Sequence, residues 1–210
     1  YSAVTGTQVV SASPIPCPSC REVPAELDPP QIRELARAFG RAAGRAKQAG
    51  ADAVEIHGAH GYLVAQFVSP YSNRRVDSYG GPLHNRLRFP FEILGEIRKA
   101  TGAEFPVIYR ISARERVPGG ITLEEALAIT LSLAAEGVDA FHISTGVYGS
   151  MPYIIPNYSL PDGINVEDAA AIKEHTGLPV IVAGKIADVL LADSIISGGR
   201  ADVVAMGRPS

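Results

Sequence analysis

Two histidines and a tyrosine stand close together in the chain, and their side chains could carry out acid–base chemistry. His57 and His60 lie three residues apart, directly after a short apolar run, and Tyr62 follows two residues later. Two imidazoles at this spacing can converge on one anionic or carbonyl oxygen, and a phenol beside them can transfer a proton. The residues alone leave two other interpretations open: a zinc site, which would need a third ligand, and a purely structural role in the core.

Polar residues also follow the other apolar runs of the chain. They are Arg110, Ser144, Lys185 and Arg208. In parallel α/β folds the carboxyl ends of the strands meet at one side, where catalytic groups collect. The positions therefore predict one site to which several strands contribute.

The elements that position these residues alternate regularly. Asp28, followed by two prolines and Gln31, predicts a capping box that opens a helix, and Gly50 ends it. A second capping box, Thr122 with Glu125, predicts another helix to Glu136. Further helices are predicted over residues 85–100, from 165 onward and over 187–196. The predicted strands cover residues 53–57, 106–111, 139–144, 179–184 and 202–207.

Strands that are apolar almost throughout and alternate with helices predict an α/β fold with a parallel sheet. A doubly wound sheet and a (β/α)8 TIM barrel both fit, but no strand is followed by the Gly-x-Gly-x-x-Gly turn of dinucleotide folds. We therefore expect residues 1–210 to form the C-terminal five-eighths of a TIM barrel, with the first three βα units preceding this chain. Residues 1–28 are expected to be a proline-rich loop, and residues 29–210 the five strands with their helices.

The composition excludes several classes of partner. With 19 basic and 22 acidic residues the net charge is -3, which argues against nucleic acid or an anionic membrane as a partner. No apolar run reaches the length of about 18 residues that a membrane span needs. We expect a soluble, cytoplasmic homo-oligomer.

The arginines that recur every four residues along the first helix are expected to form a solvated face. They are Arg33, Arg37, Arg41 and Arg45.

The two cysteines, Cys17 and Cys20, lie in a Cys-Pro-Ser-Cys stretch. Two thiols cannot fill a four-ligand zinc or iron–sulfur site without further ligands. A surface loop without redox role is therefore favoured over a disulfide or a half-site, and no bound metal is expected.

The stretch from His57 to Arg86 is the most specific part of the sequence. It contains His-Gly-Ala-His-Gly-Tyr, then Ser-Pro-x-x-Asn-x-Arg, then Tyr-Gly-Gly, and Arg110-Ile111-Ser112 and Gly207-Arg208-Pro209 follow later strands. With Gly184, these motifs resemble the old yellow enzyme family of FMN-dependent oxidoreductases, particularly its 2-enoate reductase and 2,4-dienoyl-CoA reductase branch. The resemblance extends from about Ser13 to Pro209.

The resemblance implies roles for individual residues. His57 and His60 would bind the oxygen of an unsaturated carbonyl, carboxylate or thioester, so that its alkene accepts hydride from the flavin. Tyr62 would protonate the other alkene carbon. Arg110 would lie near the flavin N1 and C2 oxygen. The FMN phosphate would be bound by the loop at Gly184 and Lys185 and by the turn at Gly207 and Arg208, and NADH or NADPH would reduce the flavin.

Three features set limits to this expectation. The chain has Pro82-Leu83-His84 where relatives often have Ser-Leu-Glu, so an expected carboxylate is absent. Lys185 occupies a variable position. The first three strands, which contact the isoalloxazine in the family, are not in this sequence. Two alternatives therefore stay open, a flavin-free phosphate-binding barrel acting as lyase or isomerase and a non-catalytic barrel fragment.

The loop from Asn73 to Gly81 is expected to fold through internal hydrogen bonds.

Overall fold

The computed structural model describes residues 6–19 and 21–207, and its centre is a parallel sheet of five strands. These are β3 (Val54–Gly58), β4 (Val107–Ser112), β5 (Ala140–Ser144), β6 (Val180–Ala183) and β7 (Val203–Ala205). The strands follow one another in sequence order, and every neighbouring pair is parallel. All five predicted strands are therefore present.

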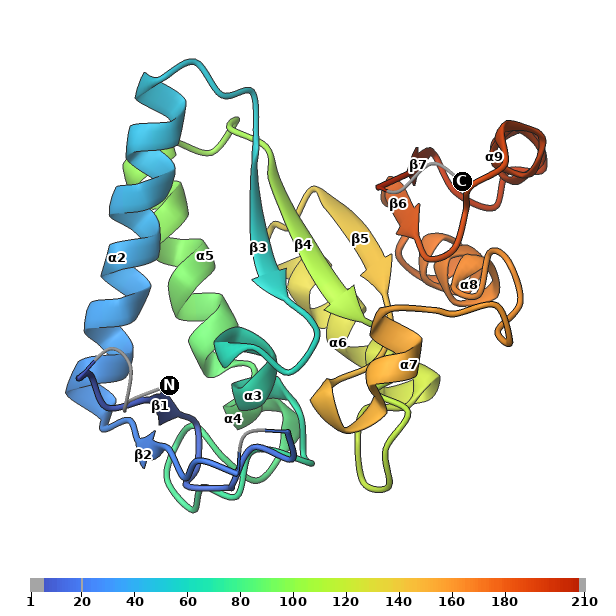
Figure 1. Cartoon of the computed structure of the whole chain (residues 1–210). Coiled ribbons are helices and arrows are strands. Elements are labelled where there is room, and N and C mark those ends of the chain that lie inside the picture. The colour runs from blue at the N-terminus through green and yellow to red at the C-terminus, as the bar shows by residue number, and fades with distance from the viewer. Residues whose placement is uncertain (1–5, 20, 208–210) are drawn as a thin grey trace.

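Helices alternate with these strands, as the sequence predicts. They are α2 (Pro29–Gln48), α3 (Leu63–Val68), α4 (Leu83–Arg86), α5 (Arg88–Thr101), α6 (Leu123–Ala135), the short η1 (Tyr148–Ser150) and α7 (Met151–Ile154), α8 (Val166–Thr176) and α9 (Val189–Ser197). The carboxyl ends of β3, β4 and β5 point toward the same side of the molecule, where α3 and α7 also lie (Figure 1).

The two faces of the sheet differ in burial. On one face, Ile56, Tyr109 and Phe141 are buried in the main hydrophobic core together with apolar residues of the long helices. Their neighbours along the strands point the other way, because successive side chains of a strand alternate between faces. This second face carries His57, Arg110 and other polar residues, which are only partly buried.

One close contact in the sheet depends on a glycine. A Cβ atom at Gly58 would overlap the phenol ring of Tyr109 on the neighbouring strand. Glycine at this position lets the buried Tyr109 ring pack beside the last residue of β3.

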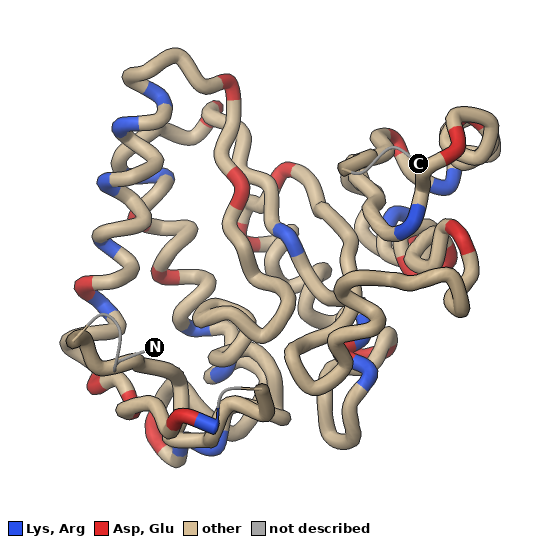
Figure 2. Tube along the Cα trace, in the orientation of Figure 1, with Lys and Arg blue, Asp and Glu red and all other residues tan. Residues whose placement is uncertain are grey.

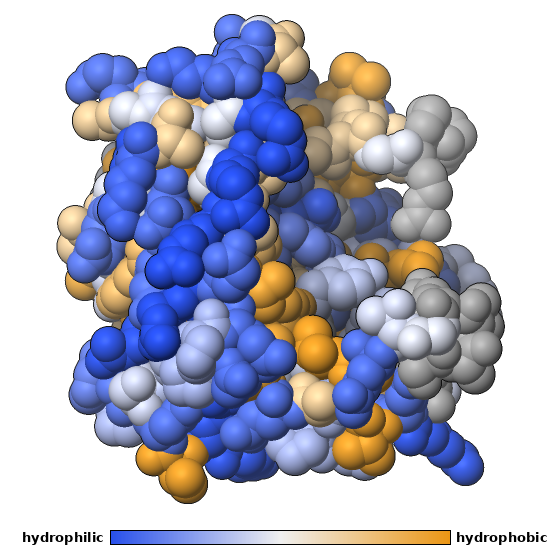
Figure 3. All heavy atoms as spheres, turned by 90° about the vertical axis from the view of Figure 1, so that its left-hand side faces the viewer, coloured by the Kyte–Doolittle hydropathy of each residue, from blue (hydrophilic) through white to orange (hydrophobic). Residues whose placement is uncertain are grey.

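Helix α2 begins as predicted. The Asp28 carboxylate accepts a hydrogen bond from Gln31 N at 2.7 Å, and Gln31 Oε1 accepts one from Asp28 N at 2.9 Å. All four arginines of the predicted solvated face are exposed. Basic residues line the outer side of this helix in Figure 2, and the surface over it is mostly hydrophilic in Figure 3.

The second capping box is only half formed. Thr122 Oγ1 accepts a hydrogen bond from Glu125 N at 3.3 Å, but the Glu125 carboxylate pairs with Arg86 at 2.5 Å instead of returning to the helix start. The expectation for Glu125 is therefore wrong, because a buried guanidinium 39 residues away competes for its carboxylate.

The segment before α2 is more ordered than the predicted loop. β1 (Val10–Ser11) and β2 (Ala25–Glu26) form a small parallel sheet, and Ala12 and Leu27 belong to the main core. Cys17 is partly buried, whereas Cys20 lies outside the described residues, so the expectation for the cysteine pair stays a prediction.

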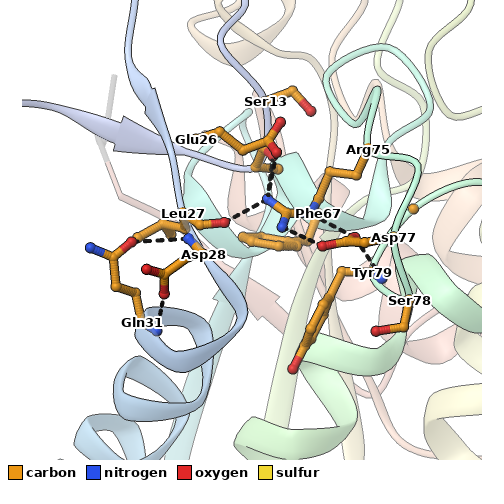
Figure 4. A network of polar contacts seen from close by, with 12 residues as sticks. Ser13, Glu26, Leu27, Asp28, Gln31, Phe67, Arg75, Asp77, Ser78 and Tyr79 are labelled. Carbon is orange, nitrogen blue, oxygen red and sulfur yellow. Dashed lines mark hydrogen bonds and ion pairs between the residues drawn. The ribbon is translucent and has the colours of Figure 1, made fainter.

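Arg75 anchors this segment to the loop that follows α3. Its buried guanidinium donates hydrogen bonds to Leu27 O at 2.7 Å and to Ala12 O at 2.9 Å. It also pairs with Asp77 at 2.6 Å and lies over the ring of Phe67 (Figure 4).

Asn73 closes the same loop by donating to Phe67 O and Tyr79 O. The contacts of Asn73 with Tyr79 and of Arg75 with Asp77 are of the internal kind expected for the loop, whereas the bonds of Arg75 to Ala12 and Leu27 connect the loop to another segment.

In the part of the chain that the structure describes, no helix is both long and apolar enough to cross a membrane.

Candidate active site

The three residues that the sequence singles out first lie together where β3 ends. The ring centroids of His57 and His60 are 5.2 Å apart, those of His57 and Tyr62 are 5.2 Å apart, and those of His60 and Tyr62 are 6.5 Å apart. Gly58 ends the strand, and the short turn 59–62 brings His60 and Tyr62 back beside His57. Two imidazoles and a phenol therefore share one small space.

The turn requires an unusual backbone at His60. Its φ of 60° lies in the left-handed region, which is uncommon for residues other than glycine. Two serines hold it. His60 N donates to Ser112 Oγ at 3.0 Å, and the His60 Nε2 atom lies 2.6 Å from Ser144 Oγ. Ser112 in turn donates to Gly146 O at 2.9 Å. The ends of β4 and β5 are thereby joined to the turn after β3 through the backbone and the ring of His60.

Both imidazoles are held neutral by their surroundings. Burial, followed by the positive charge of Arg110, lowers the pKa of His60 to about 4. The same two causes lower the pKa of His57. A neutral imidazole carries one N–H donor and one acceptor nitrogen. At pH 7 each ring can therefore donate one hydrogen bond to an oxygen without bringing a positive charge.

Tyr62 has a second phenol beside it. The hydroxyls of Tyr62 and Tyr148 are 3.3 Å apart, and their rings meet nearly edge to face with centroids 5.8 Å apart. Tyr62 is 47% exposed, so its hydroxyl can exchange protons with solvent. The sequence interpretation did not include Tyr148 in the site.

Arg110 lies next to His57 on the neighbouring strand. The two residues are register partners in β3 and β4, and His142 of β5 is the next partner in the same row. Arg110 Nε is buried and has no hydrogen-bond partner among residues 6–19 and 21–207. Buried donors nearly always have an acceptor. A flavin carbonyl oxygen or N1 fits this unpaired donor, so Arg110 suits the FMN ring.

The predicted phosphate residues are only partly described. Gly184 has a φ of 132°, and a Cβ atom there would overlap the Asn165 side-chain amide. The Lys185 ammonium pairs with Asp162 at 3.1 Å and donates to Leu160 O. Its charge is therefore shared with groups of the preceding loop. Gly207 is exposed, and Arg208 lies outside the described residues.

Asn165 is a further residue at this end of β6. Its Nδ2 donates to Ala183 O at 2.7 Å, whereas its Oδ1 is buried without a partner among the described residues. The sequence suggested only that Asn165 starts α8, and its side chain makes no hydrogen bond to that helix. The sequence places Ser144 at the end of its strand but not against His60. Neither that contact nor the contact of Asn165 could be found from local pattern, because the partners lie 84 and 18 residues away.

A cavity of about 430 Å³ borders Tyr62. Its walls also include most of residues 9–18, Glu22 and Pro24, Gly61 and Gln66, Tyr71 and Ser72, Glu115, and residues 147–149. This volume lies within the range typical of small-molecule pockets.

The zinc alternative lacks a third ligand in the described chain. Among residues 6–19 and 21–207, no three side chains of histidine, cysteine, aspartate or glutamate gather as a candidate metal site.

Comparison with known families agrees with this fold and with an FMN-binding site. The model of the NADH:flavin oxidoreductase / NADH oxidase family matches residues 5–210. The chain belongs to this family, whose members use FMN with NADH or NADPH. Membership favours FMN over the flavin-free alternative.

Curated relatives share substantial identity with the chain. An NADH oxidase of Thermoanaerobacter brockii is 46% identical over 203 residues, which are 97% of this chain and 31% of that protein. An NADPH dehydrogenase of Clostridium acetobutylicum is 40% identical over 209 residues, covering 99% of this chain and 60% of that protein. The chain thus spans between about a third and three-fifths of these relatives.

Solved structures agree with the fold. A 2-naphthoyl-CoA reductase in complex with 2-naphthoyl-CoA superimposes with a TM-score of 0.88 at 32% identity, covering 96% of this chain and 31% of that one. Morphinone reductase in complex with tetrahydroNAD gives 0.75 at 27% identity, with 98% and 57% covered.

Proposed function

We propose that this chain forms the substrate-activating part of an FMN-dependent ene-reductase, which reduces an activated carbon–carbon double bond. The observation that carries the proposal is the cluster of His57, His60 and Tyr62 beside Arg110. When bound and reduced by NADH or NADPH, FMN supplies hydride to one alkene carbon. The residues of this chain would activate the alkene and deliver the proton.

His57 and His60 would bind the oxygen that conjugates with the alkene. If Ser144 Oγ donates to His60 Nε2, the proton of the neutral ring lies on Nδ1, which is then free to donate to that oxygen. Hydrogen bonds from neutral donors draw electron density toward the oxygen and make the far alkene carbon electrophilic.

Tyr62 would complete the reduction. Hydride addition leaves negative charge on the carbon next to the activating group, and the Tyr62 hydroxyl would protonate that carbon. The resulting phenolate would accept a hydrogen bond from Tyr148 and recover its proton from solvent, to which Tyr62 is exposed. One hydride and one proton together account for the saturated product.

Gly184, Lys185, Gly207 and Arg208 would bind the FMN phosphate. Since the Lys185 ammonium already pairs with Asp162, we expect the backbone at Gly184 and the Arg208 guanidinium to provide most of the phosphate contacts. Arg110 would contact the flavin ring through its unpaired Nε.

The substrate would be a small unsaturated carbonyl, carboxylate or thioester. The cavity beside Tyr62 would take the part of the molecule beyond the alkene, and its apolar wall residues include Val9, Ile15 and Val147. The five strands would belong to a (β/α)8 barrel whose first three units precede this chain. Its cytoplasmic location and homo-oligomeric state stay predictions.

The test uses the complete protein that carries this sequence. Purified protein should show flavin absorption bands that NADH or NADPH bleaches without oxygen and that 2-cyclohexen-1-one restores. His57→Ala and His60→Ala should each slow the second step at limiting enone and leave the first nearly unchanged. Flavin that is reduced but not reoxidised by any of a panel of enones and enoates would contradict the ene-reductase assignment.

A further inference from the structure

The sheet face that carries Arg110 also holds two groups to which the proposed reaction assigns no role. Glu55 of β3 and His142 of β5 alternate with the buried Ile56 and Phe141, so both point to the same face as Arg110. The Glu55 Oε2 atom lies 2.7 Å from His142 Nδ1. This pair joins two strands that are not neighbours.

The strand register shows where the pair crosses β4. Arg110 is the register partner of His142, whereas Glu55 is the partner of Ile108. The Glu55–His142 contact must therefore pass over β4 between Ile108 and Arg110. Neighbouring strands are about 4.8 Å apart, so both side chains have to reach toward each other across β4. Arg110 lies directly on the carboxyl-end side of this bridge.

Glu55 carries a negative charge on the same face of the sheet as Arg110. Burial raises the pKa of Glu55, but the hydrogen bond from His142 and the nearby positive charge of Arg110 act against burial, and the net effect lowers the pKa. The carboxylate is therefore ionised at neutral pH. It provides a negative charge on the inner side of Arg110, while His142 occupies the adjacent position in the row.

We propose that Glu55 and His142 are positioning residues that hold Arg110 toward the carboxyl ends of the strands. The inference rests on the proposed function, in which Arg110 contacts the flavin ring. Because the Glu55–His142 bridge crosses β4 between Ile108 and Arg110, it would block the Arg110 side chain from turning back toward the amino ends of the strands. A guanidinium so held stabilises negative charge on the reduced flavin more than a mobile one does.

The flavin midpoint potential separates a positioning role from a simple charge effect. If Glu55 acted only through its charge, both Glu55→Gln and Glu55→Ala would raise the potential, because removing a negative charge favours the anionic reduced flavin. If the bridge positions Arg110, Glu55→Ala and His142→Ala should instead lower the potential. Glu55→Gln should not lower it, because the amide oxygen can still accept from His142 Nδ1.

A double variant, a rescue variant and a control test whether the effect on the potential comes from the Glu55–His142 bridge. The double variant of Glu55→Ala and His142→Ala should match the single variants, since one bridge is lost in each case. His142→Gln, which can donate to Glu55, should recover most of the potential lost in His142→Ala. Asp202→Ala is the matched control. It breaks the Lys173–Asp202 pair near the start of β7 and should lower Tm without changing the potential.

The measurement uses the complete flavoprotein, with FMN affinity recorded beside the potential. An unchanged or raised potential in both Glu55→Ala and His142→Ala would overturn the bridge. Arg110→Ala distinguishes this failure from the failure of the proposed function. If the bridge test fails but Arg110→Ala lowers the potential, only the positioning role of Glu55 and His142 is refuted. If Arg110→Ala leaves the potential unchanged, the contact of Arg110 with the flavin is refuted, and the positioning role with it. Where an alanine variant does not fold, Glu55→Met and His142→Leu replace it, because neither side chain can form the bridge. Both should lower the potential, and an unchanged or raised potential in both would overturn the bridge.

Discussion

Ser144 controls which nitrogen of His60 can reach a ligand, because its hydroxyl lies 2.6 Å from Nε2. Ser144→Ala should loosen the ring and weaken the binding of phenolic ligands about fivefold, which corresponds to a typical hydrogen bond of about 1 kcal/mol. A titration of the charge-transfer band in the flavoprotein measures this. Ser132→Ala, at a partly buried serine of α6 whose hydroxyl donates to Ala128 O, serves as control. Equal affinities in wild type and Ser144→Ala would show that Ser144 does not orient His60.

The lowered pKa of His60 makes a prediction about stability. The unfolded chain binds a proton on this histidine below about pH 6.5, whereas the folded protein binds it only below about pH 4. The contribution of His60 to stability is therefore fully present above about pH 6.5 and is lost as the pH falls toward 4. Urea unfolding from pH 7 to pH 4 should show a smaller decline in His60→Asn than in wild type. Parallel curves would mean that His60 is not the group that titrates.

Tyr62→Phe should spare flavin reduction by NADH or NADPH and slow alkene reduction. Phenylalanine keeps the ring contact with His57 and removes only the proton, and a positioned acid contributes about 10²- to 10⁴-fold. Stopped-flow absorbance of the two half-reactions measures the effect. Tyr148→Phe should slow the alkene step less, because Tyr148 would only support the phenolate. Equal slowing of both half-reactions in Tyr62→Phe would point to a role in shaping the flavin site instead.

Among the elements, the segment before α2 depends on one buried guanidinium. Arg75→Met should destabilise the protein by about 3–5 kcal/mol, because it removes the buried guanidinium that pairs with Asp77 and donates to two backbone carbonyls. Arg74→Met at the exposed neighbouring position should change the free energy of unfolding by less than about 0.5 kcal/mol. Chemical unfolding measures both, and limited proteolysis should cut residues 6–27 first in Arg75→Met. Similar stability of the two variants would refute the anchoring role.

The sequence predicts the elements well where a local pattern decides them. The five strands are short runs with apolar residues at most positions, each preceded by glycine or proline, and α2 carries its own start and stop signals. β1 and β2 were missed because two-residue strands have no periodicity to detect. The contacts of Ser144, Tyr148 and Glu125 were missed for another reason: each joins residues at least 39 positions apart, and only the fold brings those together.

For the whole molecule, the proposed barrel predicts how the 210-residue segment behaves alone. β3 and β7 are the outer strands of the five-stranded sheet, and unpaired outer strands favour association between copies. The segment expressed alone should self-associate and bind FMN weakly, whereas a protein extended by three βα units should be monodisperse and yellow. Light scattering and flavin absorbance test this. A monodisperse segment that retains FMN would contradict the eight-unit barrel.

The anchoring of the segment before α2 has a consequence for protein engineering. Arg75 binds the backbone carbonyls of Ala12 and Leu27, and any amino acid supplies a carbonyl. Cavity-lining side chains of this segment that are exposed or only partly buried, such as Val9, Val10 and Ile15, can therefore change without loss of the anchor, whereas Ala12 belongs to the core. This wall behaves as an exchangeable module. Grafting it between relatives, or randomising it in directed evolution, offers a way to alter substrate scope while the histidines and Tyr62 stay in place.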